Sequence, residues 1–161
     1  MAAPSAHRPP RDCPLCPRLK EFRHANRRAH PDFFNEPVPS FGSPDARLLI
    51  VGLAPGLNGA NRTGRPFTGD YAGDLLYASL KRHGLARGKY GASADDGFEL
   101  LGVRISNAVR CVPPQNKPSP AEIKTCRPFL SAEIAAMKNL KAILALGGIA
   151  HDSVGAWSSR R

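Results

Sequence analysis

Short apolar runs alternate with stretches of helical periodicity over most of the chain. The apolar run over 48–51, which ends at Gly52, is typical of a buried strand, and the segments 103–109 and 142–146 predict two more strands, ended by the prolines at 113–114 and by Gly147. Apolar residues recur at helical spacing over 71–83, from Ser119 to about Leu140, and from Ile149 onward. This alternation of strand and helix predicts an α/β fold with a parallel sheet and helices packed on it.

Residues 1–46 differ from the rest of the chain. Prolines recur there and interrupt any long helix or central strand, so at most a short helix over about Leu19–Arg28 fits. We expect this proline-rich N-terminal segment, which carries Cys13 and Cys16, to form one structural unit with an α/β domain over 47–161.

Two long loops directly follow predicted strands. Residues 54–70 come after the first strand and residues 110–118 after the second. In parallel sheets, ligand-binding loops lie at the carboxyl ends of the strands, so these loops predict the functional site. The glycine spacing from Gly52 to Gly59 matches no phosphate-binding loop, which argues against a nucleotide-phosphate site.

A single aromatic residue, Phe67, lies in the first loop among polar and charged residues. An aromatic face between basic side chains can stack on a nucleobase while phosphates are held nearby, and the neighbours here are Asn61, Arg62, Arg65 and Asp70. Each of these positions also has a structural interpretation. Phe67 fits a core residue, and Asp70 fits the N-cap of the helix that follows it.

Charge and composition narrow the class of partner. Lys and Arg total 23 against 13 Asp and Glu, a formal net charge of +10, which attracts polyanions and makes DNA the first partner to consider. The chain has neither a run of about 18 apolar residues nor a signal-peptide core, so we expect a cytoplasmic protein without membrane contact. No pattern indicates an oligomer, and we expect a nucleoid-associated monomer.

The four cysteines leave several interpretations open. Cys13 and Cys16 form a C-x2-C pair, whereas Cys111 and Cys126 are isolated. This asymmetry favours a 4Fe-4S cluster over four-cysteine zinc, although both groups take thiolate ligands. A zinc site of Cys13, Cys16, His24 and His30 departs from the usual finger spacing. Cys111 and Cys126 also fit small buried hydrophobic residues.

Two long motifs then carry a family resemblance. The segment Gly52–Asp70 reads GLAPGLNGANRTGRPFTGD and the segment Ser106–Pro118 reads SNAVRCVPPQNKP. With the four cysteines in this order, they resemble the family 5 uracil-DNA glycosylases, the iron-sulfur branch related to the family 4 enzymes. The similarity runs from Cys13 to about Ser153. Leu53 points to family 5, because family 4 enzymes carry an acidic residue at that position.

The resemblance implies a three-layer α/β/α fold that flips uracil, and other deaminated bases such as hypoxanthine, out of DNA and hydrolyses the N-glycosidic bond. It implies that Asp70 orients a water or stabilises positive charge on the sugar. The remaining implied roles are base binding by Gly52, Leu53, Ala54, Gly56, Phe67 and Asn107, DNA binding by Asn61, Arg62 and Arg65, and cluster ligation by Cys13, Cys16, Cys111 and Cys126. For Asn107, satisfying a backbone group at a strand end remains an alternative.

The similarity stops before a segment that the family contains. Family members continue past the third strand to another strand and a His-Pro-Ser loop, and His30-Pro31 lies far too early to supply it. Gly155 and the polar residues after it predict that the last helix dissolves, which indicates a C-terminally incomplete fold. We therefore expect an unpaired sheet edge, impaired folding and compromised activity. The alternative functions are an iron-sulfur DNA-binding protein with impaired catalysis and an electron-transfer protein.

Overall fold

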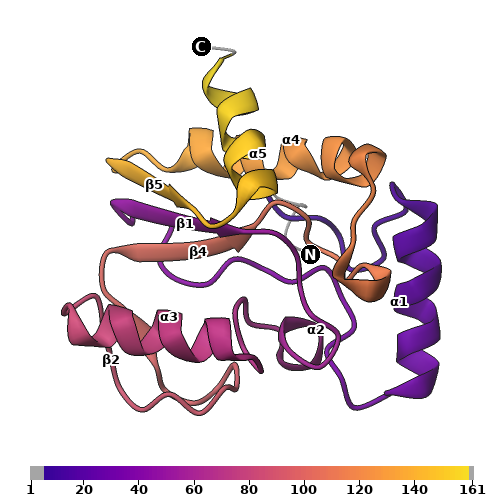
Figure 1. Ribbon diagram of the computed structural model, residues 1–161, viewed down its shortest axis with the longest axis horizontal. Helices are drawn as coiled ribbons and strands as arrows, with labels where there is room; N and C mark the ends of the chain where they lie inside the picture. The colour runs from indigo at the N-terminus through magenta and orange to yellow at the C-terminus, as the bar shows by residue number, and fades with distance from the viewer. Residues whose placement is uncertain (1–5, 160–161) are drawn as a thin grey trace.

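A three-stranded parallel sheet organises the computed structural model, which describes residues 6–159 (Figure 1). Its strands are β1 (Leu48–Gly52), β4 (Val103–Asn107) and β5 (Ala142–Ala145), in the order β4-β1-β5. In the β1–β4 pairing, Leu48 lies opposite Val103 and Gly52 opposite Asn107. The carboxyl ends of β1 and β4 therefore lie next to each other, as the sequence predicts.

Helices cover both faces of this sheet, so the predicted three-layer α/β/α fold is confirmed (Figure 1). One face packs on α3 (Tyr71–Arg82) and on a small antiparallel hairpin of β2 (Ala86–Arg87) and β3 (Glu99–Leu100). The opposite face packs on α4 (Pro120–Ala136) and α5 (Gly148–Ser158).

Alternate residues of β1 supply the two cores. Ile50 packs with Ile105 of β4 and with Tyr77 and Leu80 of α3. Leu49 and Val51 face the other side and pack against α4 and α5. This is the pattern of a strand that is buried on both faces. Full burial of one such aliphatic side chain contributes about 1.5–3 kcal/mol to folding.

The N-terminal segment is joined to the same body through α1 (Pro17–Ala29), which stands at one side of the sheet (Figure 1). Leu19 is 1% exposed and packs with Val109, Cys111 and Cys126 in a third apolar cluster. The predicted short helix is confirmed, with its start two residues earlier.

Capping residues define the starts of α3 and α4 as predicted. Ser119 accepts a hydrogen bond from the Glu122 backbone N–H, and the Glu122 side chain accepts one from the Ser119 N–H, which completes a capping box. Asp70 caps α3 by accepting from the Gly73 N–H. At the other end of α3, Gly84 has a φ of +72°, where glycine carries no steric penalty.

Several sequence predictions need correction. The segment 54–70 contains the short helix α2 (Ala60–Thr63), and 110–118 contains the 3-10 turn η1 (Pro114–Asn116). The hairpin of β2 and β3 was not predicted, and α4 ends at Ala136 rather than near Leu140. The prediction that the last helix dissolves is wrong, because α5 continues to Ser158 and Trp157 packs against the cluster beneath it.

The strand β5 forms one edge of the sheet, and its outer side pairs with no strand among the described residues. Its Leu144 side chain is 47% exposed. The predicted unpaired edge is therefore present. None of the helices over residues 6–159 has the length and apolar character needed to cross a membrane.

Candidate functional site

A cavity of about 540 Å³ opens at the carboxyl ends of β1 and β4, a size typical of small-molecule sites. Its wall is formed by the loop after β1, the first turns of α3, the end of β4 and the residue that follows β5. The predicted residues that line it are Gly52, Leu53, Ala54, Gly56, Phe67, Asp70 and Asn107. The structure thus brings together the predicted catalytic residue and all of the predicted base-binding residues.

Gly52 lets the Phe67 ring approach the backbone of β1. A Cβ atom on Gly52 would lie 2.6 Å from Phe67 Cε2 and 2.6 Å from Asn107 Oδ1, well inside van der Waals distance. Phe67 itself has a φ of +56°, an uncommon conformation for a residue with a bulky side chain. The absence of a side chain at Gly73 permits this conformation, because a Cβ atom there would collide with the Phe67 carbonyl oxygen. The loop therefore fixes the ring in the cavity wall.

Both interpretations of Phe67 find support. The ring is half-buried and packs against the cluster on the α3 face, as a core residue would. It also lines the cavity next to Asn107, where it can stack on a planar ligand.

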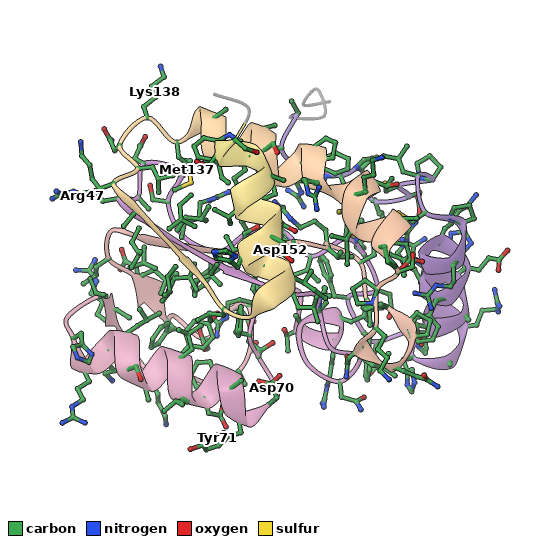
Figure 2. All side chains as sticks on the ribbon, turned by 45° about the horizontal axis from the view of Figure 1, so that its top comes forward. Arg47, Asp70, Tyr71, Met137, Lys138 and Asp152 are labelled. Atoms are coloured by element: carbon green, nitrogen blue, oxygen red, sulfur yellow. The ribbon has the colours of Figure 1, made fainter. Side chains whose placement is uncertain are left out.

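Asp70 is the N-cap of α3 and also lines the cavity. Its Oδ1 accepts the Gly73 N–H at 2.7 Å, which confirms the N-cap interpretation, and the side chain is solvent-exposed at the cavity mouth. Its second oxygen, Oδ2, accepts no hydrogen bond from any residue in 6–159. Figure 2 shows Asp70 beside Tyr71 at the first turn of α3, with Tyr71 turned outward. One carboxylate oxygen thus holds the helix while the other faces solvent.

Asn107 ends β4 and is 4% exposed. Its carbonyl oxygen accepts from Arg110 Nε at 3.0 Å, but its side-chain amide makes no hydrogen bond within the described part of the chain. The predicted alternative, an amide that satisfies a strand-end backbone group, is therefore not supported. A side-chain amide carries two donors and an acceptor, which suits recognition of a base edge.

A buried ionic network that sequence reasoning missed supports β4 from behind. Glu133 Oε2 lies 2.6 Å from Arg110 Nη2 and accepts from Ser106 Oγ, while Glu133 Oε1 lies 2.6 Å from Arg104 Nε. Burial alone would raise the pKa of Glu133, but Arg110 and Arg104 hold it below its ordinary value. This network holds the Arg110 guanidinium that bonds to Asn107.

The three residues predicted to bind DNA have different surroundings. Arg62 is exposed, with its guanidinium 5.5 Å from the Phe33 ring centre, and its contact with DNA stays a prediction. Asn61 is fully buried and donates from Nδ2 to Asn35 Oδ1 at 2.9 Å. The expectation that Asn61 faces DNA is therefore corrected: it joins two loops inside the protein.

Arg65 is also buried, and its predicted contact with DNA is corrected in the same way. Its side chain is 2% exposed and makes two hydrogen bonds to Asp96, at 2.8 and 2.6 Å. The guanidinium lies over the rings of Phe41, Tyr77 and Tyr90. The hydrogen bonds from Arg65 hold the pKa of Asp96 well below its usual range against the opposing effect of burial. Arg65 anchors the loop that carries Phe67.

The four cysteines line one small cavity between α1, α4 and the loop after β4, together with Leu19 and Arg23. The enclosed space is about 10 Å³, and no group of three or more His, Cys, Asp or Glu side chains in residues 6–159 is arranged to hold a metal ion. Burial raises the pKa of Cys16 to about 11 and of Cys111 to about 12. His24 and His30 do not line this cavity.

Comparison with known proteins shows one consistent family. The family model of the uracil DNA glycosylase superfamily matches residues 39–160. The chain is 49% identical over 145 residues to the type-5 uracil-DNA glycosylase of Mycobacterium tuberculosis. The aligned region covers 86% of this chain and 54% of that protein. It is 43% identical over 147 residues to the type-5 uracil-DNA glycosylase of Thermus thermophilus, covering 88% and 67% respectively.

A family 4 relative is more distant. The type-4 uracil-DNA glycosylase of Pyrobaculum aerophilum is 33% identical over 152 residues, covering 94% of this chain and 63% of the relative. The resemblance to the type-5 branch is confirmed. The chain spans between about half and two thirds of the length of these curated relatives.

Proposed function

The chain belongs to the uracil DNA glycosylase superfamily, and from this premise we propose that it excises uracil from DNA by hydrolysing the N-glycosidic bond and leaves an abasic site. The observation that carries the proposal is the contact of Gly52, Phe67 and Asn107 in a cavity whose mouth holds Asp70. An aromatic face, a side-chain amide and a carboxylate are the groups that this reaction requires.

The cavity explains how an extruded base is bound. The target bond is unreachable inside the duplex, so the nucleotide must leave the stack before the reaction. In the proposal, the base stacks on Phe67 and its polar edge bonds to the Asn107 amide. Ala54 and Gly56 line the same wall, and their backbone N–H groups donate to no residue in 6–159, which leaves them for a base carbonyl. The volume of about 540 Å³ also admits a purine such as hypoxanthine.

Asp70 is the group that acts on the sugar. Cleavage of the bond develops positive charge on the sugar and negative charge on the departing base. A carboxylate at the mouth stabilises the sugar charge or orients a water, while the Asn107 amide and the loop N–H groups stabilise the base. The free Oδ2 of Asp70 is the atom available for this role, because Oδ1 is held by the Gly73 N–H.

We also propose that Cys13, Cys16, Cys111 and Cys126 hold a 4Fe-4S cluster. Support comes from the meeting of four thiols, from three separate segments, around one cavity. A cubane takes one thiolate at each iron, so its ligands need not converge on one point as they must for tetrahedral zinc. Because the enclosed space is only about 10 Å³, binding requires the thiols to move apart. The cluster supplies a structural support next to the loop after β4.

A single preparation tests both proposals. The chain is expressed anaerobically, its iron is measured, and it is incubated with a labelled duplex that holds one uracil, with the matching thymine duplex as control. We expect free uracil, alkali-labile sites and about four iron atoms per chain, the number in the cluster. Salt-sensitive DNA binding without base release would overturn the glycosylase proposal in favour of a DNA-binding protein. A second duplex with hypoxanthine defines the substrate range.

A further inference from the structure

Arg23 is a buried cation in the wall of the cysteine cavity. It lies on α1, is 1% exposed, and is among the largest fully buried side chains of the protein. Its Nη1 donates to Cys111 Sγ at 3.4 Å and its Nη2 to the Cys13 carbonyl oxygen at 3.0 Å. Its Nε is buried and has no hydrogen-bond partner among the described residues. The guanidinium thus bonds at two points to the segments that carry the cysteines.

No carboxylate in residues 6–159 forms an ion pair with Arg23, although its charge helps to lower the pKa of Asp12 after the larger effect of Arg27. Two other arginines of α1 do have carboxylate partners: Arg18 pairs with Glu122 and Arg27 with Asp12, each within 2.7 Å. Arg23 forms no such ion pair. A buried charge without a counter-charge costs several kcal/mol, so buried ions are paired in folded proteins. The side chain within hydrogen-bond distance of the Arg23 guanidinium is that of Cys111, through its Sγ atom.

From these contacts we infer that Arg23 is the counter-cation of the group held by the four cysteines and sets its affinity for electrons. The inference rests on the proposed cluster. Four thiolates leave such a site with negative charge, and each added electron increases it. A fixed cation and an N–H···S hydrogen bond favour the reduced form, because net charge and hydrogen bonds to sulfur set cluster potentials. Arg23 supplies both effects from one side chain.

The test uses the full chain, purified anaerobically, with three variants. Arg23→Gln removes the charge, and Arg23→Lys keeps the charge but lacks the planar fork that reaches both Cys111 and Cys13. Arg28→Gln, an exposed arginine of the same helix, is the matched control. Iron content, visible absorption and the midpoint potential from spectroelectrochemical titration are measured for each protein.

We expect Arg23→Gln to lower the equilibrium constant for one-electron reduction about tenfold, equivalent to a shift of about 59 mV. Arg23→Lys should give a smaller shift in the same direction, and Arg28→Gln none. If Arg23→Gln fails to fold, the Arg23→Lys protein decides: a potential equal to that of the wild type contradicts the inference. Iron in the wild type with equal potentials in all variants would overturn the role of Arg23 alone. A wild type without iron would overturn the cluster and this inference together.

Discussion

Gly52 and Phe67 are in contact across the floor of the cavity, so closely that the ring occupies the space of a side chain on Gly52. The same space is bounded by Asn107 Oδ1 on β4, which pairs with β1 at this position. Three residues that are far apart in the sequence therefore share one small volume. The register of the sheet sets this arrangement, and a change of one methyl group disturbs it.

The first prediction is that Gly52→Ala lowers uracil excision strongly and leaves the fold intact. The added methyl displaces Phe67 and Asn107, and a misplacement of about 1 Å at a reacting site costs about 100-fold in rate. Single-turnover excision at saturating enzyme measures the loss, and circular dichroism measures the fold. Gly155→Ala is the control, because a Cβ at Gly155 meets no atom within 4 Å. Equal excision by wild type and Gly52→Ala would contradict the base-stacking geometry.

Asp70→Asn separates the two functions of this residue. Asparagine is as good an N-cap as aspartate, so α3 should stay capped and the thermal midpoint should change little. Loss of the charge should reduce turnover about 10²–10³-fold, with DNA affinity nearly unchanged. Parallel excision and DNA-binding titrations measure the two quantities. Equal losses of turnover and DNA affinity would indicate that Asp70 is only a structural cap.

The sequence predicts most of the fold because local signals suffice for it. The apolar run at 48–51, the capping box at Ser119 and the N-cap at Asp70 each act within a few residues. The cavity could be predicted as well, because parallel strands bring their carboxyl ends together. The β2–β3 hairpin could not, because strands of two residues show no alternation.

The burial of Arg65 and Asn61 does not follow from the sequence, for a physical reason. Arg65 and Asn61 lie in a polar loop and look exposed, but their partners, Asp96 and Asn35, are distant in the sequence. The sequence does carry a signal for Glu133. It lies three residues after Leu130 and four before Met137, on the buried stripe of α4, where a charge needs a partner.

Asp96→Asn should lower the free energy of unfolding and make that free energy depend less on pH under acidic conditions. Removing one partner of a buried ion pair leaves Arg65 unpaired and costs about 3–5 kcal/mol. The pKa of Asp96 is lowered in the folded state, so its contribution is complete above about pH 4, the ordinary range of an unfolded carboxyl, and is lost as the pH falls further.

Urea unfolding of wild type and Asp96→Asn at neutral pH and near pH 3 measures both effects. The difference between the two proteins should shrink at the lower pH, because the unfolded wild type then takes up a proton on Asp96 that the folded protein, with its lowered pKa, does not. Asp95→Asn, at an exposed neighbouring position, is the control and should match the wild type within about 0.5 kcal/mol. A difference that stays constant with pH would contradict the ion-pair explanation.

Cys126→Ser tests the cysteine site against the simpler interpretation of a buried thiol. Cys126 is 7% exposed on α4 and packs with Leu19, Val109 and Cys111. If it ligates a cluster, Cys126→Ser should lose iron and unfold at lower urea concentration than the iron-bound wild type. The neighbouring Thr125→Ala, in the wall of the same cavity, should retain iron. Iron content equal to that of the wild type in Cys126→Ser would eliminate the four-cysteine site and leave Cys126 as a packing residue.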